Sequence, residues 1–130
     1  MIVETSAVIA MVAGEPERVE FTAAILDAPV ARMSAVSYLE AAIVIDARAD
    51  LELSRNLDRL IEELQITVEP VTVAQAAIAR LAYRRYGRGS GHPAGLNFGD
   101  CFGYALAKDT GESLLFTGDD FGHTDVTPAR

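Results

Sequence analysis

The chain has 130 residues and a formal net charge of −8; half of its residues are hydrophobic and 23% are charged. This composition is typical of one folded domain, which we expect to span residues 1–130. No apolar run reaches the ~18–20 residues that cross a bilayer, and no basic stretch precedes the apolar opening as in a signal peptide. The single cysteine, Cys101, cannot form an internal disulfide. We therefore expect a cytoplasmic protein with no membrane anchor.

Short apolar segments alternate with helical patterns in the first half of the chain. We expect strands at residues 2–3 and 31–33 and helices at about 7–13, 15–28, 35–49 and 50–65. Thr5 or Ser6 is the expected N-cap of the first helix and Ser34 that of the third, because hydroxyl oxygens accept hydrogen bonds from free backbone N–H groups. The third helix is predicted from apolar residues at helical spacing, which are Val36, Leu39, Ile43 and Ala47.

The second half continues the alternation. We expect strands at 67–71 and 114–116, a helix at 73–86 capped by Thr72, and a second helix at about 98–107 closed by Gly111. A glycine-rich loop at 87–93 separates the two helices, and a short edge strand is expected near residues 125–126. Strands that alternate with helices predict an α/β fold, with a short parallel sheet of four to five strands covered by helices on both faces.

Acidic residues stand where predicted strands end or predicted helices begin. They are Glu4, Glu40, Asp100, Asp119 and Asp120. The carboxyl ends of parallel strands meet at one edge of a sheet, and ligands bind at that edge. Carboxylates gathered there repel one another unless a cation holds them, and hard oxygen ligands suit Mg²⁺ or Mn²⁺. The pattern therefore predicts a metal-dependent phosphoryl-transfer enzyme.

Each acid also has a purely structural interpretation. Asp100 is a plausible helix cap, Glu40 lies in an apolar stretch where a single buried ion pair would satisfy it, and the Asp119–Asp120 pair suits a turn. The functional interpretation is favoured because all these positions can be collected by one site.

Four segments, in order, resemble the motifs of the PIN-domain ribonucleases, and specifically the VapC toxins of bacterial VapBC toxin–antitoxin pairs. They are Met1-Ile2-Val3-Glu4-Thr5-Ser6-Ala7, Met33-Ser34-Ala35 leading to Tyr38-Leu39-Glu40, Leu96-Asn97-Phe98-Gly99-Asp100, and Leu114-Leu115-Phe116-Thr117-Gly118-Asp119-Asp120-Phe121. The resemblance covers essentially the whole chain. The combination at these spacings is specific, whereas any one motif alone would be weak.

The resemblance implies a PIN-like domain and a Mg²⁺-dependent endoribonuclease that hydrolyses RNA phosphodiester bonds, with Mn²⁺ able to replace Mg²⁺. It implies metal ligation by Glu4 and Asp100, and a catalytic set that Glu40 and Asp119 complete. The supporting residues that it implies are Thr5, Ser6, Asn97, Thr117 and Asp120.

One position departs from the family pattern. The family normally has Asp at the first acidic position, where this chain has Glu4. The side chain is one methylene longer, and Mg²⁺ tolerates little departure from octahedral geometry. A displacement of about an ångström can lower the rate roughly 100-fold. The alternative function is therefore a catalytically impaired PIN module that binds antitoxin or RNA without efficient cleavage.

Arginines gather after residue 80 in an otherwise acidic chain. Arg84, Arg85 and Arg88 are the predicted RNA contacts, beside glycines that leave the loop free to approach a ligand. A negative total charge argues against a nucleic-acid partner, but a bound metal ion reverses the sign locally. The structural alternative is a solvated helix end whose arginines complement the helix dipole.

The resemblance further implies a homodimer, a VapB-type antitoxin as partner, and no membrane. Apolar residues of the early helices suit either the core or a face that receives a second copy or an antitoxin helix; they are Met11, Val12, Phe21 and Leu26. A rival class is the phospho-acceptor receiver domain, which also has an acidic pocket and Mg²⁺. It needs a lysine after a late strand, whereas Lys108, the only lysine, lies in a predicted helix.

Overall fold

The computed structural model describes residues 1–130 as a four-stranded sheet flanked by helices. The strands are β1 (Ile2–Val3), β2 (Ala31–Ser34), β3 (Ile66–Glu69) and β4 (Leu114–Leu115). The helices are α1 (Thr5–Val12), α2 (Arg18–Asp27), α3 (Ala35–Asp46), α4 (Leu51–Glu63), α5 (Val73–Tyr86), α6 (Asp100–Thr110) and the 3₁₀ helix η1 (Asp120–His123). None of these helices is long and apolar enough to cross a membrane.

The sheet is parallel throughout, in the order β3-β2-β1-β4. The predicted α/β class, with a parallel sheet covered on both faces, is confirmed. Ile2 is in register with Arg32 on one side and with Leu114 on the other. Because the strands run in the same direction, the residues that follow β1 and β4 lie at one edge of the sheet.

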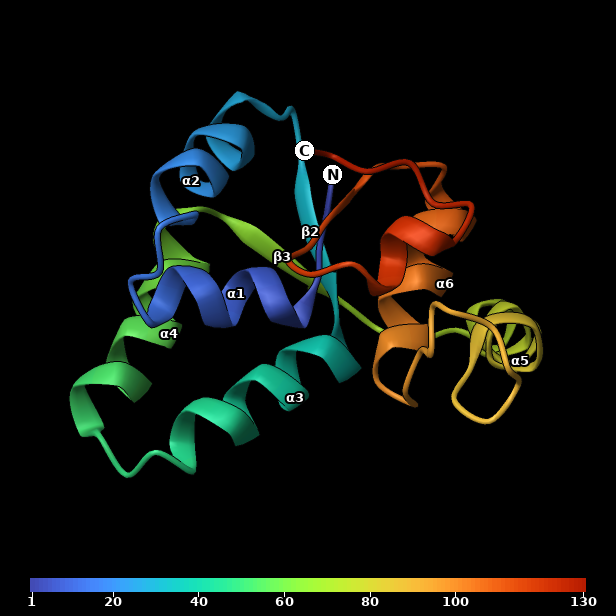
Figure 1. The fold of residues 1–130 in the computed structure, drawn as a ribbon. Helices are drawn as coiled ribbons and strands as arrows, with labels where there is room; N and C mark the ends of the chain where they lie inside the picture. The colour runs from blue at the N-terminus through green and yellow to red at the C-terminus, as the bar shows by residue number, and fades with distance from the viewer.

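Two apolar clusters fill the two sides of the sheet. Val3 and Leu115 pack with residues of α1 to α4, whereas Ile2 and Leu114 pack with residues of α5 and α6. Figure 1 shows the first group of helices in blue and green on one side, and α5 and α6 in yellow and orange on the other. Side chains alternate between the faces of a strand, so Glu4, two residues after Ile2, points to the α6 side.

The predicted helix caps are observed with one exception, although α2 begins at Arg18 and not at about residue 15. Ser34 caps α3, Thr72 caps α5, and Gly111, with a φ of 71°, ends α6. The prediction that Thr5 or Ser6 caps the first helix is wrong. Helix α1 begins at Thr5, and its N-cap is Glu4, whose side chain accepts a hydrogen bond from the Ser6 backbone N–H.

The apolar residues that predicted α3 are largely outside the core. Leu39 and Ile43 are 56% and 60% exposed, and the buried face of α3 consists of Ser37, Ala41 and Ile45. Small residues on the buried face let a helix approach its neighbours closely, and α3 packs against α1. The apolar spacing therefore identified the helix but not the side that it buries.

The C-terminal tail forms no strand at residues 125–126. It joins the sheet instead through one parallel bridge between Leu114 and Pro128. Leu114 N–H donates to Thr127, and Ala129 N–H donates to the Leu114 carbonyl. The expected edge strand is thus replaced by two backbone hydrogen bonds two residues further along the chain.

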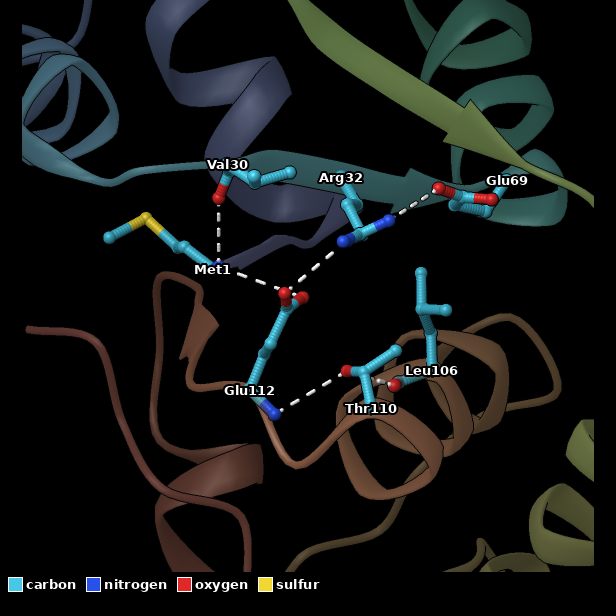
Figure 2. A network of polar contacts seen from close by, with 7 residues as sticks. All are labelled: Met1, Val30, Arg32, Glu69, Leu106, Thr110 and Glu112. Atoms are coloured by element: carbon cyan, nitrogen blue, oxygen red, sulfur yellow. Dashed lines mark hydrogen bonds and ion pairs between the residues drawn. The ribbon is translucent and has the colours of Figure 1, made fainter.

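A polar network ties the strands together on the α6 side of β2 (Figure 2). The Arg32 guanidinium lies 3.0 Å from Glu69 Oε1 and 3.3 Å from Glu112 Oε1. The other oxygen of Glu112 lies 3.6 Å from the Met1 amine, which donates to the Val30 carbonyl. One arginine therefore joins the end of β3 to the residues just before β4, and the chain's amino terminus completes the network.

Candidate functional site

Glu4 is buried where β1 meets α1. Glu4 is only 1% exposed, and its Oε2 accepts a 2.7 Å hydrogen bond from the Ser6 N–H. The other oxygen, Oε1, is buried and has no hydrogen-bond partner. Burial raises the pKa of Glu4 to about 7, and the charges of Asp100 and Glu40 act in the same direction. A buried carboxylate with an unpartnered oxygen is costly unless a cation or proton compensates it.

Helix α6 lies directly against Glu4. A Cβ at Gly103 would come within 3.1 Å of Glu4 Cγ and 3.8 Å of Ser37 Oγ. Because Gly103 has no side chain, it leaves space for the Glu4 side chain between β1 and α6. Ser37 is fully buried, and its hydroxyl has no hydrogen-bond partner, so a second polar group faces the same space. Sequence analysis did not identify Ser37, because nothing in its local pattern distinguishes it from a packing residue.

Asp100 begins α6 and is held by the preceding turn. Asp100 Oδ2 accepts from the Asn97 N–H at 2.9 Å, and Asn97 Oδ1 accepts from the Asp100 N–H at 2.8 Å. Burial raises the pKa of Asp100, and the charges of Glu40 and Asp120 raise it further. The Asn97 hydrogen bond and the charge of Arg88 lower it. The reciprocal bonds orient the carboxylate, and they fit the positioning role expected of Asn97.

Glu40 enters the site from α3. Its carboxylate rests on Gly99, where an added Cβ would lie 2.6 Å from Glu40 Cδ and closer still to Oε2. Gly99 precedes Asp100 in the chain, so this contact brings the carboxylates of α3 and α6 together. The two carboxylates repel each other, and this repulsion adds to the effect of burial in raising the pKa of Asp100. Three of the predicted catalytic acids, Glu4, Glu40 and Asp100, therefore act electrostatically on one another.

The segment after β4 closes the site. The Thr117 N–H donates to Ser6 Oγ at 3.0 Å, and the Thr5 hydroxyl donates to the Ser37 carbonyl at 3.2 Å. These bonds fasten the start of α1 to β4 and to α3. The predicted supporting residues Thr5, Ser6 and Thr117 thus lie beside Glu4, and their observed bonds hold the backbone that carries it.

Asp119 and Asp120 follow a glycine with a φ of 81°, and both are exposed. Asp119 is the N-cap of η1 but makes no side-chain capping bond. The charge of Asp120 raises the pKa of Asp100. The structure therefore brings Asp120 into electrostatic reach of the other acids, although Asp119 was the residue predicted to be catalytic and Asp120 the one predicted to support it.

The predicted RNA-contacting arginines point in different directions. The positive charge of Arg88 lowers the pKa of Asp100. Arg84 lines a groove that also contains Phe98 and Phe102, beside Asp100. Arg85 lies over the Tyr86 ring, 4.8 Å from its centroid, in a hollow shared with Tyr104 and Lys108 on another side of α5. Only Arg84 and Arg88 therefore lie on the side of the acidic residues.

The donor set fits a hard divalent cation in its chemistry. Glu4 Oε1 is buried and unpartnered, the hydrogen bond from Asn97 engages only one oxygen of Asp100, and Glu40 adds a third negative charge. Oxygen donors with excess negative charge suit Mg²⁺ or Mn²⁺. As the side chains stand, no group of three or more acidic, histidine or cysteine residues is arranged around a common point as metal ligands.

Comparison with known proteins gives concordant matches. The PIN domain family model matches residues 1–126. The chain is 57% identical over 129 residues to ribonuclease VapC28 of Mycobacterium tuberculosis, covering 99% of this chain and 97% of the relative. It is 48% identical over 126 residues to ribonuclease VapC of Mycolicibacterium smegmatis, covering 97% of each.

A solved structure matches the fold. The crystal structure of VapC20 of Mycobacterium tuberculosis, described as a sarcin-ricin loop cleaving toxin, aligns with a TM-score of 0.72 over 97% of this chain and 95% of that one. Its sequence identity is 17%, so the similarity establishes the fold alone.

Proposed function

The chain belongs to the PIN-domain family, among its VapC ribonucleases, and on that premise we propose that it is the toxin of a type II toxin–antitoxin pair and a Mg²⁺-dependent endoribonuclease. One observation carries the proposal: Glu4 is buried with one oxygen unpartnered, and the charges of Asp100 and Glu40 raise its pKa further. The N-cap role of Glu4 engages one of its oxygens and leaves the other without a partner. A divalent cation would supply the missing partner of these carboxylates and would also attract the phosphate of the RNA.

Glu4 and Asp100 are the proposed ligands of the ion, directly or through water. A bound divalent ion polarises a phosphodiester and lowers the pKa of a water ligand. Glu40 reaches the site from a separate helix and is partly exposed, so it is suited to accept a hydrogen bond from the attacking water and orient it. Arg88, whose charge already acts on Asp100, is suited to contact the phosphate.

The impaired module is the second candidate, and a specific observation favours it. Glu4 folds back to cap α1 through Ser6, so one of its oxygens is already engaged. A side chain that serves as a helix cap is less free to follow an ion during the reaction. In this alternative the chain binds antitoxin or RNA but cleaves poorly.

The proposed partners are an RNA substrate, a VapB-type antitoxin and a second copy of the chain, and the proposed compartment is the cytoplasm. A hollow between α1, α2 and α4, lined by residues that include Thr22, Asn56 and Leu60, is suited to an antitoxin helix. Met11 and Val12 lie at its base and are buried in the core. The exposed Leu39 and Ile43 on α3 offer an apolar face for a second copy. An antitoxin arginine that enters the acidic pocket would inhibit the enzyme, and full activity with saturating antitoxin would refute that mode of inhibition.

The decisive experiment compares cleavage of a mixed RNA pool by the chain as it stands, Glu4→Asp and Asp100→Asn, each with Mg²⁺, Mn²⁺ or EDTA. We expect metal-dependent cleavage by the chain, loss of cleavage in Asp100→Asn, and no cleavage in EDTA. Cleavage by Glu4→Asp, with none by the chain as it stands, would establish that Glu4 makes the chain a catalytically impaired PIN module. If neither the chain as it stands nor Glu4→Asp cleaves RNA, and Mn²⁺ titration shows no binding, the nuclease proposal fails.

A further inference from the structure

An aromatic groove lies between α5 and the start of α6, next to the acidic residues. Its walls include Tyr83, Phe98 and Phe102, with Arg80 and Arg84 on its α5 side, and its volume is about 310 Å³. Figure 1 shows α5 and α6 side by side. We call these five residues the aromatic groove. Residues of the core, such as Ala79, form its floor.

The aromatic rings of the groove are unusually open to water. Phe98 is 73% exposed and Tyr83 is 44% exposed. Phe98 packs edge-on against Phe102, with ring centroids 5.0 Å apart and an angle of 69° between the rings. One side of the Phe98 ring is therefore supported by protein while much of its surface remains uncovered. An exposed aromatic surface held in this way is suited to receive a planar ligand.

Phe98 is also fixed in position relative to the acids. It lies between Asn97 and Asp100, whose reciprocal hydrogen bonds close the turn at 2.9 and 2.8 Å. The next residue, Gly99, supports the Glu40 carboxylate. A ligand stacked on Phe98 is thereby held at a set distance from Asp100 and Glu40, which the proposed function places at the scissile phosphate.

The charges around the groove identify the kind of ligand. Arg80 and Arg84 are four residues apart on α5, so they lie on one face of the helix, and Arg88 follows beside Asp100. They are positive charges in a chain of net charge −8. Arginines along a groove with exposed aromatic rings are the features by which proteins hold single-stranded nucleic acid, through phosphate contacts and base stacking.

We propose that the aromatic groove binds one unpaired base of the RNA, next to the phosphate that is cut, by stacking on Phe98 and Tyr83, while Arg80 and Arg84 contact the neighbouring phosphates. The inference rests on the proposed function and adds a base-binding subsite to it, formed by Phe98 and Tyr83 beside the acidic residues. Bases within an A-form duplex are stacked on one another and their faces are not available to the groove.

The test uses the Asp100→Asn background, so that RNA is bound and not cut, with a 12-nucleotide single-stranded RNA of mixed sequence and its duplex as probes. Phe98→Leu removes the ring but keeps the apolar surface, and it should weaken single-strand binding roughly 5- to 100-fold. Phe98→Trp should restore that affinity. The chain contains no tryptophan, so the tryptophan fluorescence of the Phe98→Trp variant reports on this position alone. That fluorescence should be quenched when the single strand binds.

Leu81→Ala is the matched control. Leu81 is 62% exposed on the same helix but lines the separate hollow that contains Arg85, so its loss should leave RNA binding unchanged. The duplex should bind more weakly than the single strand to the Asp100→Asn protein, and Phe98→Leu should have less effect on duplex binding.

Three results would overturn the inference. The first is equal affinity for the single strand in Phe98→Leu and in the Asp100→Asn parent. If the unmodified chain still showed metal-dependent cleavage, that result would refute the inference and leave the proposed function intact. Conversion of a dimer to a monomer by Phe98→Asp, with RNA binding unchanged in Phe98→Leu, would assign the groove to a second copy of the chain. Absence of both RNA binding and cleavage would refute the inference and the proposed function together.

Discussion

The carboxylate of Glu40 rests on the bare Cα of Gly99, and through this contact α3 delivers an acid to the first turn of α6. Gly99 has a φ of −63° and a ψ of −40°, an ordinary helical conformation that any residue adopts. Glycine is therefore not needed here for backbone freedom. The contact with Glu40 accounts for it.

Gly99→Ala tests this relationship. Alanine suits the backbone at this position and should leave the free energy of unfolding within about 1 kcal/mol of the parent value. Its methyl group, however, would occupy the place of the Glu40 carboxylate and displace it, so RNA cleavage should fall roughly 10- to 100-fold. The measurement pairs urea unfolding with cleavage kinetics. In the Glu40→Ala background, Gly99→Ala should cost little further activity, and an equal loss in both backgrounds would contradict the proposed contact.

Glu4 should make stability depend on pH in the metal-free protein. Its pKa is raised from 4.5 to about 7 by burial. A raised folded-state pKa means that the contribution of Glu4 to stability is fully present below about pH 4.5 and is lost as pH rises through about 7. In EDTA, the chain should therefore lose up to about 3 kcal/mol between pH 5 and 8 relative to Glu4→Gln, which has no charge to bury.

The check is urea unfolding of both proteins at several pH values. Gln keeps an oxygen for the Ser6 N–H, so the comparison isolates ionisation from capping. If Glu4 ligates Mn²⁺ as proposed, the affinity of the chain for Mn²⁺ should rise as pH passes through about 7, because a carboxylate ligand must be ionised. Parallel stability profiles for the chain and Glu4→Gln would show that burial does not perturb Glu4.

The two neighbouring acids after β4 should differ in their effects. The charge of Asp120 raises the pKa of Asp100, whereas the Asp119 side chain makes no capping hydrogen bond to η1. Asp120→Asn should therefore reduce cleavage about tenfold or more, and Asp119→Asn should have a smaller effect. Both variants remove one exposed charge from adjacent positions, so each controls for the other. A larger loss in Asp119→Asn would restore the assignment made from the motif.

The sequence predicts the site better than it predicts the contacts within it. The acids Glu4 and Asp100 could be identified because each follows or begins a regular element, and parallel strands bring such positions to one edge. The contact of Glu40 with Gly99 could not, because it depends on how α3 packs against α6. The capping role of Glu4 was missed because local preference favours Thr or Ser at that position.

Spacing on α5 explains the mixed outcome for the arginines. Adjacent residues lie about 100° apart around a helix, so Arg84 and Arg85 cannot both face the acids. Arg80, four residues before Arg84, shares its face, and that spacing could have identified it from sequence. What the spacing cannot tell is which face the fold turns toward the site, since that depends on packing against α6.

Replacement of Arg32, which lies away from the site, should lower the stability of the protein more than replacement of an exposed arginine. Its guanidinium lies between Glu69 and Glu112, whose side chains are 27% and 23% exposed (Figure 2). Arg32→Met removes the shared partner of two partly buried carboxylates, so it should lower the free energy of unfolding by more than the loss of a fully exposed ion pair does. Arg32→Lys keeps the charge but loses the forked guanidinium that reaches both acids, and it should give an intermediate loss.

Arg130→Met provides the control, because Arg130 pairs with Glu20 where the two side chains are 45% and 52% exposed, and such pairs contribute about 0–1 kcal/mol. Urea unfolding at pH 7 measures all three variants. Adding Glu112→Gln to Arg32→Met should recover part of the loss, since it removes the carboxylate left without the guanidinium. Equal effects of Arg32→Met and Arg130→Met would mean that solvent screens the Arg32 network as it screens a surface pair.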